Sequence, residues 1–200
     1  MSLKYDTVFI DLFTKIACRL ARHPHVLLAV EVCKDGKFVQ VEVFPAIAIE
    51  AISKYVASFE REERSEVFIH LGAIRPDFAK TRSPQPDDFL EVFGFVTSGD
   101  GASIEAAAKI ARAQLVLSGG DNLSALFAFD QPMPIAVLKS LQGRIGDLAK
   151  RGSRGASTAM PIAGTVAWPT RDYGRHEAEF GKLLRAPRRR DPAIITPVFA

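Results

Sequence analysis

The chain has 200 residues, of which 48% are hydrophobic and 24% charged, and its formal net charge is +3. A chain of this length and apolar content can bury a substantial core, which excludes a disulfide-stapled miniature. Its two cysteines complete no zinc-ligand pattern, and no apolar run approaches the roughly 20 residues of a membrane-spanning helix, so we expect reduced thiols, a cytoplasmic location and no membrane partner.

The first third of the chain predicts a helix, a hairpin and a second helix. Apolar residues recur at helical spacing over residues 7–21. Branched and aromatic residues dominate residues 26–33 and 38–44, and the polar turn 34–37 lies between them. Helical spacing returns over residues 46–63.

The middle of the chain predicts two strands separated by a long loop. Residues 67–71 have the composition of a buried strand, and residues 89–96 of another. Residues 72–88 carry three prolines together with Arg75, Lys80 and Arg82. Prolines cannot sustain a helix or a central strand, so we expect an exposed basic loop.

The remaining elements predict a mixed fold. Ser103 is a suitable N-cap for a helix, and residues 115–117 and 124–129 form a predicted hairpin. A further helix is expected over residues 134–150, followed by an irregular segment at 151–157. This order of elements predicts an α+β domain with a largely antiparallel sheet backed by helices.

Three motifs follow one another in the second half of the chain: Ser118-Gly119-Gly120, a strand that ends in Asp130-Gln131-Pro132, and a box containing Gly164-Thr165 and Trp168-Pro169. In this order they resemble primase-polymerase domains of the archaeo-eukaryotic primase superfamily, particularly the RepB-type replication primases of plasmids and phages. The resemblance spans residues 67–180 and implies a core like that of the RNA recognition motif (RRM-like). We expect one domain over residues 1–185, with an N-terminal part at 1–65, a motif-bearing part at 66–185 and a basic tail at 186–200.

The resemblance also implies a metal site. Two divalent ions would be held partly by an acid-x-acid pair at the end of a strand, whose alternate residues share a face. Thr97 and Gly99 occupy the matching positions, and neither is a carboxylate. Asp100 is the nearest acid, but Gly-Asp-Gly is typical of a turn. We therefore predict no catalytic residue and no cofactor, with Mg²⁺ or Mn²⁺ required only if the chain is active.

Basic and aromatic residues indicate a nucleic-acid surface. Cations pair with phosphates and aromatic rings stack on unpaired bases. Ser118 matches a serine that contacts phosphates in the family, although no histidine follows it. The predicted nucleic-acid or nucleotide contacts are Arg75, Lys80, Arg82, Ser118, Arg154, Thr165, Trp168, Arg171 and Arg175.

Three hypotheses follow. The first is a catalytically degenerate primase-polymerase-like domain of plasmid or phage replication, which binds DNA or RNA or serves as an accessory, with a replication helicase as a possible partner. The second is an active enzyme whose metal site is rebuilt from other acids, with Asp87, Asp88, Asp100, Asp121 and Asp147 as candidates. The third is a protein-interaction scaffold.

His70 ends an apolar strand, where a satisfied core or edge residue is expected in place of a ligand.

Overall fold

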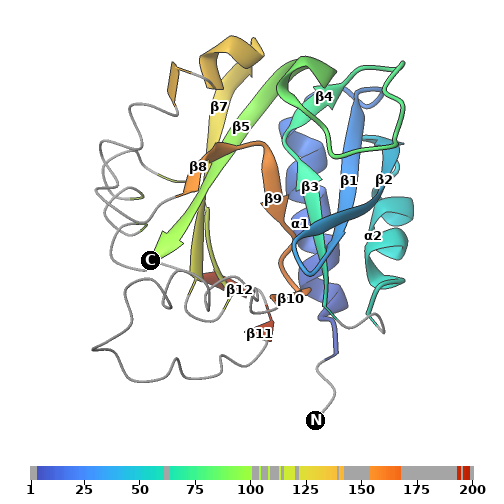
Figure 1. Ribbon diagram of the computed structural model, residues 1–200, viewed down its shortest axis with the longest axis vertical. Helices are drawn as coiled ribbons and strands as arrows, with labels where there is room; N and C mark the ends of the chain where they lie inside the picture. The colour runs from blue at the N-terminus through green and yellow to red at the C-terminus, as the bar shows by residue number, and fades with distance from the viewer. Residues whose placement is uncertain are drawn as a thin grey trace.

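The computed structural model describes residues 4–60, 64–100, 104, 108, 113, 115–119, 122–138, 140–141, 154–167, 193–194 and 196–198. Most described strands belong to two antiparallel sheets, ordered β2-β1-β3-β9 and β12-β6-β7-β5-β4, and β8 pairs with β5. Helices α1 and α2 lie behind the first sheet (Figure 1). The α+β class and the antiparallel pairing predicted from the sequence are confirmed.

The first sheet and the two helices that pack on it are built from the predicted N-terminal elements. They are α1 (Thr7–Leu20), β1 (Leu27–Lys34), β2 (Lys37–Pro45), α2 (Ile49–Ala57) and β3 (Ser65–His70). Asp6 caps α1 by accepting hydrogen bonds from the amides of Val8 and Phe9. Helix α2 begins later than predicted because the amide of Ala46 donates to Val26 and that of Ala48 to Pro45, which holds this stretch in a turn.

The two helices bury one face of β1. Leu28, Val30 and Val32 point into the core shared with α1 and α2, where Phe13 and Ile52 are almost fully buried. Alternate residues of a strand point to opposite faces, so Ala29 and Glu31 lie on the other side. The apolar residues on that other side form a separate cluster with Phe78 and Phe89.

The segment between β4 (Gly72–Ile74) and β5 (Phe89–Asp100) covers this second face and includes a short 3₁₀ turn, η1 (Pro86–Asp88). Phe78 is 9% exposed and packs in the same cluster as Ala29, Val41 and Ile74. The expected exposed loop is therefore wrong in one respect, since an apolar anchor holds it on the sheet while its basic side chains remain exposed.

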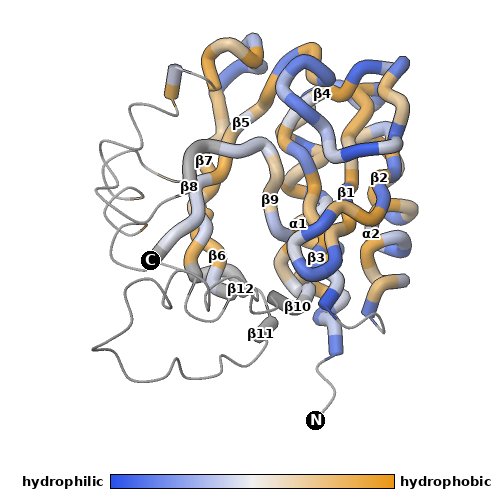
Figure 2. The backbone as a smooth tube through the Cα atoms, in the orientation of Figure 1, coloured by the Kyte–Doolittle hydropathy of each residue, from blue (hydrophilic) through white to orange (hydrophobic). Residues whose placement is uncertain are grey.

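The second sheet is longer than predicted. It comprises β4, β5, β6 (Leu115–Gly119), β7 (Asn122–Met133), β8 (Arg154–Ser157) and β12 (Thr196–Val198). Hydrophobic residues predominate along β5 and β7 (Figure 2). The expected irregular segment at 151–157 is corrected, because its last four residues form β8. Ile104, Ala108 and residues 135–138 and 140–141 are helical, and the rest of the two predicted helices lies outside the described residues.

The chain returns to the first sheet after β8. Strand β9 (Ala159–Pro161) pairs with β3, and β10 (Val166–Ala167) pairs with β11 (Ala193–Ile194). One cluster of buried residues joins α1, β1 and β3 to Val96 and Leu126 of the second sheet. The two sheets therefore share a core.

Candidate nucleic-acid interface

Strand pairing defines the two faces of the second sheet. Ser98 of β5 is the register partner of Ser124 of β7, which is in turn the partner of Leu117 of β6. Directly opposed residues in antiparallel strands place their side chains on one face. Thr97 and its partner Ala125 therefore lie on the other face.

The face that contains Thr97 is covered by helical residues. Phe95 and Phe127 stack with their ring centroids 4.8 Å apart, and both belong to a cluster with Ile104 and Leu138. Thr97 itself is 0% exposed. The positions matched to an acid pair, Thr97 and Gly99, are therefore on the helix-covered face. Ser118 shares that face through the register Gly99–Leu123–Ser118.

The opposite face carries a pair of hydroxyl groups. The Oγ atoms of Ser98 and Ser124 are 2.7 Å apart in a half-buried position. The backbone places Asp100 two positions further along the same face, opposite Asn122. At the outer edge of β5, Arg154 of β8 is the register partner of Ser98. A basic residue and two hydroxyl residues thus share one row of the sheet.

The described residues do not fit a two-ion metal centre. Among them no three His, Cys, Asp or Glu residues are grouped so that they could hold an ion. The hydroxyls of Ser98 and Ser124 are neutral and bonded to each other, whereas Mg²⁺ is usually held by carboxylates. Asp121 and Asp147 lie outside the described residues, and so does the side chain of Asp100.

The basic side chains of the 75–88 loop all have partners within the protein. Arg82 forms a fork with Asp88, at 2.6 and 2.8 Å, and its guanidinium lies 5.6 Å from the ring centroid of Phe78. Lys80 is paired with Glu42. The hydrogen bond from Arg82 holds the pKa of Asp88 below its ordinary value, against a smaller opposing effect of burial. The positive charge of the loop is therefore largely compensated by neighbouring acids.

Arg75 completes this arrangement. Its Nε donates to the carbonyl of Asp87 at 3.0 Å, and its backbone amide donates to the carbonyl of Asp88. The Asp87 carbonyl is thus used in closing the loop, and the Asp88 carboxylate accepts from Arg82 and from the amide of Gln85. Neither aspartate belongs to a metal-binding group among the described residues.

The Gly164-Thr165 part of the motif forms a turn that is bonded to the beginning of α1. The amide of Asp6 donates to the carbonyl of Gly164 at 2.8 Å, and Thr165 is 0% exposed, with its hydroxyl donating to the carbonyl of Ile162 at 2.8 Å. The prediction that Thr165 contacts nucleic acid is corrected, because a fully buried hydroxyl that closes its own turn is inaccessible. Trp168, Arg171 and Arg175 lie outside the described residues.

Sequence reasoning missed a buried contact between a carboxyl group and an imidazole ring. Oε2 of Glu31 is 2.8 Å from Nε2 of His70, and their side chains are 7% and 4% exposed. His70 is a satisfied core residue, as predicted, but its partner was not foreseen. The available signal was a single carboxylate within the apolar run 27–33, since a buried acid requires a partner.

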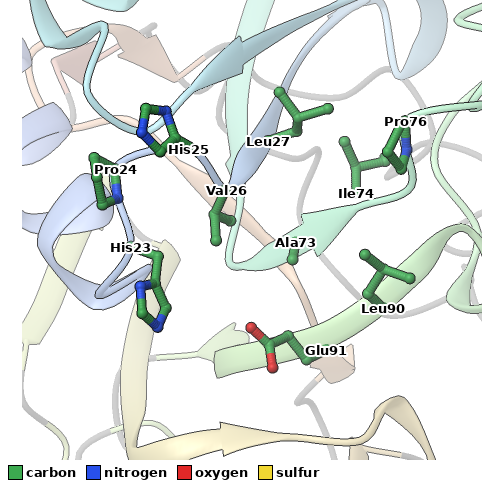
Figure 3. A pocket seen from close by; sticks show the side chains of 10 residues that line it. All are labelled: His23, Pro24, His25, Val26, Leu27, Ala73, Ile74, Pro76, Leu90 and Glu91. Carbon is green, nitrogen blue, oxygen red and sulfur yellow. The ribbon is translucent and has the colours of Figure 1, made fainter.

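A pocket of about 560 Å³ lies between the α1–β1 connection, β4 and the beginning of β5. Residues from the α1–β1 connection, β1, β4 and β5 line it together with Pro76, mostly with apolar atoms, and His23 and Glu91 are among its polar lining residues (Figure 3). Seven positions of β5 separate Glu91 from Ser98, or about 20 Å at the rise of a strand. The pocket is thus distinct from the hydroxyl pair.

Comparisons with known proteins agree with this architecture. No protein-family model and no curated protein matches the chain. Among solved structures, the chain is similar to the AEP domain of the primase-polymerase (PrimPol) of cyanophage S-2L, with a TM-score of 0.53 and 17% identity. The match covers 84% of this chain and 87% of that domain.

The chain therefore has the fold of a primase-polymerase domain. At 17% identity the similarity concerns the fold alone. In the described part of the chain, no helix is both long and apolar enough to cross a bilayer.

Proposed function

We propose that this chain is a nucleic-acid-binding domain of a plasmid or phage replication system that retains the primase-polymerase fold without nucleotidyl transfer of its own. The observation that carries the proposal is the Ser98–Ser124 hydroxyl pair near the end of β5, where the described side chains place hydroxyls and no carboxylate on the face opposite the helical residues Ile104 and Leu138. Phosphoryl transfer needs charge stabilisation by metal ions, which these hydroxyls do not supply.

The same row supports nucleic-acid binding. Hydroxyl groups donate hydrogen bonds to phosphate oxygens, and the register places Arg154 beside Ser98 at the strand edge. Phosphate contacts need no particular base sequence, which suits a domain that holds a template for a partner. The basic sequence between residues 150 and 190 adds positive charge to the same half of the chain.

The loop cations are secondary in this proposal. Arg75, Lys80 and Arg82 have acidic or carbonyl partners in the protein, so a phosphate would have to compete with them. The side chain of Arg82 remains 54% exposed and can still be approached by a polyanion. Trp168, Arg171 and Arg175 remain proposed contacts, and a replication helicase remains a proposed partner.

Two measurements test the proposal on the whole chain. Fluorescence anisotropy with single-stranded DNA or RNA at several salt concentrations should show an affinity that falls steeply as salt rises. Primer extension and primer synthesis in Mg²⁺ or Mn²⁺ should give no product. Metal-dependent product would establish the active-enzyme alternative, and the absence of salt-sensitive binding would favour a protein-interaction scaffold.

A further inference from the structure

The buried pair of Glu31 and His70 connects segments far apart in the sequence. Oε2 of Glu31 bonds Nε2 of His70, while Oε1 accepts a hydrogen bond from the hydroxyl of Ser83 in the 75–88 loop. On the other side of the ring, Nδ1 of His70 is 3.0 Å from Oγ1 of Thr158. The network therefore joins β1, β3, the loop and the β8–β9 connection.

The hydrogen-bond roles in this network are defined by the carboxylate. Ionised Glu31 can only accept, so Nε2 of His70 carries the proton that it donates. A neutral ring then accepts at Nδ1 from the hydroxyl of Thr158, and a protonated ring donates to the same hydroxyl oxygen. In both states the contact requires the hydroxyl, and a residue of the same shape without one would lose it.

Thr158 occupies the corner at which the chain changes sheets. Ser157 is the partner of Val96 in the second sheet, and Ala159 is the partner of His70 in the first. The carbonyl of Thr158 also accepts from the amide of Leu71 at 2.9 Å, and the residue is 7% exposed. Fixing this corner fixes the direction in which β8 leaves it.

Strand β8 is short and depends on such an anchor. Its pairing with β5 extends over four residues and contains an irregularity between the Val96 and Ser98 positions. Within it, Arg154 is opposite Ser98, in the row proposed above to meet phosphates. A rotation at Thr158 would carry Arg154 out of that row.

We infer that Glu31 and His70 are positioning residues that hold Thr158, and through it β8, so that Arg154 stays beside the Ser98–Ser124 pair. The last part of this inference rests on the proposed nucleic-acid function, and the anchoring of β8 does not. Ser83 is the natural comparison, because its hydroxyl reaches the same carboxylate from the 75–88 loop, whereas Thr158 belongs to the β8–β9 connection.

The test compares Thr158→Val, which removes the hydroxyl with little change of shape, with Thr158→Ser, which keeps it, and with Ser83→Ala. Amide hydrogen exchange and single-stranded DNA affinity are measured on the full chain. Thr158→Val should speed exchange in residues 154–157 by about tenfold or more while amides of the β1–β2 hairpin stay protected, and should weaken DNA binding by about fivefold. Thr158→Ser should behave like the natural chain in both measurements, and Ser83→Ala should change hydrogen exchange in the 75–88 loop instead of in β8.

Unchanged exchange in β8, or equal effects of valine and serine, would overturn the inference. If Thr158→Val does not fold, Glu31→Gln supplies the same comparison, since it weakens the bond that holds the ring. If the natural chain binds no nucleic acid, only the proposed function fails, and hydrogen exchange still decides whether the pair anchors β8.

Discussion

The backbone amide of Asp6 donates to the carbonyl oxygen of Gly164 at 2.8 Å, which joins the cap of the first helix to a turn 158 positions later in the chain. Gly164 has φ +92°, and a Cβ atom there would lie 2.3 Å from the Asp6 carbonyl oxygen. The glycine of the box is thus required for packing and backbone conformation. It allows the motif-bearing half to close on the N-terminal helix.

We expect Gly164→Ala to lower the free energy of unfolding by on the order of 3 kcal/mol, because positive φ and the backbone clash both penalise a methyl group. Urea denaturation measures the loss. Gly36→Ala is the matched control: its φ is +73°, but nothing lies within 4 Å of the added Cβ, so only about 1 kcal/mol should be lost. Equal losses in the two variants would contradict the packing role.

The hydrogen-bonded carboxylate of Glu31 should make the free energy of unfolding fall in acid. Burial raises the pKa of this carboxyl, but hydrogen bonds from His70 and Ser83 outweigh it and leave the pKa below the ordinary 4.5. Such a group stabilises the fold above pH 4.5, and the contribution is lost as the pH falls through the folded pKa. Glu31→Gln should therefore cost most near neutral pH, with the difference shrinking in acid.

Urea titrations of both proteins from neutral pH downward measure this difference. Other carboxyls with lowered pKa values, such as Glu42 and Asp88, titrate in both proteins and cancel in the comparison. A difference that stays constant through the acid range would show that the charge of Glu31 does not contribute.

The two thiols should be slow to react in the folded protein. Burial raises the pKa of Cys18 to about 11, and burial together with the nearby charge of Glu31 raises that of Cys33 to about 12. Because the thiolate is the reactive form, we expect a disulfide reagent at pH near 8 to react at least ~10-fold more slowly than with a free thiol. Denaturation should expose both, and fast labelling without denaturant would refute the burial.

Replacing the acid or the base of the Arg82–Asp88 ion pair should change the affinity for single-stranded DNA in opposite directions. Asp88→Asn removes the partner of Arg82 and leaves the guanidinium available to phosphates, so single-stranded DNA should bind severalfold more tightly. Arg82→Gln should weaken binding only slightly, because this cation is already paired. Anisotropy at two salt concentrations checks both changes. A large loss in Arg82→Gln, with a salt slope reduced by about one, would instead make Arg82 a primary phosphate contact.

A carboxylate at position 98 should create a metal site. Ser98 and Asp100 occupy positions of the same face of β5, so Ser98→Asp places two acids at the spacing that the resemblance associates with metal binding. We expect saturable Mn²⁺ binding, measured by electron paramagnetic resonance, in Ser98→Asp but not in Ser98→Asn or the natural chain. Equal Mn²⁺ binding by the natural chain would show that it already contains a metal site.

The choice between the two faces of β5 could not be made from the sequence. The pattern around Val96 predicted a strand, but a shift of one residue exchanges its faces. Thr97 matched the motif by spacing, and pairing with Ala125 places it against the helices instead. The amino-acid composition of a strand does not determine which of its two faces a neighbouring helix will cover.

The loop cations illustrate the same limit. Their exposure was foreseen from the prolines around them, yet the partner of Lys80 is Glu42, 38 positions away, and Phe78 is buried against a strand of the first sheet. A partner at such separation is found only when the chain has folded.

The sequence by itself determined the two N-terminal helices, the longer strands and their antiparallel class, because the periodicity of apolar residues and the placement of turn residues act over a few neighbours. It also identified the motif residues whose order resembles primase-polymerases. Only the tertiary structure decided that Thr165 is sealed inside a turn, that Ser98 meets Ser124, and that Glu31 meets His70. These outcomes depend on strand register and on contacts between distant segments, which the packing of the whole core selects.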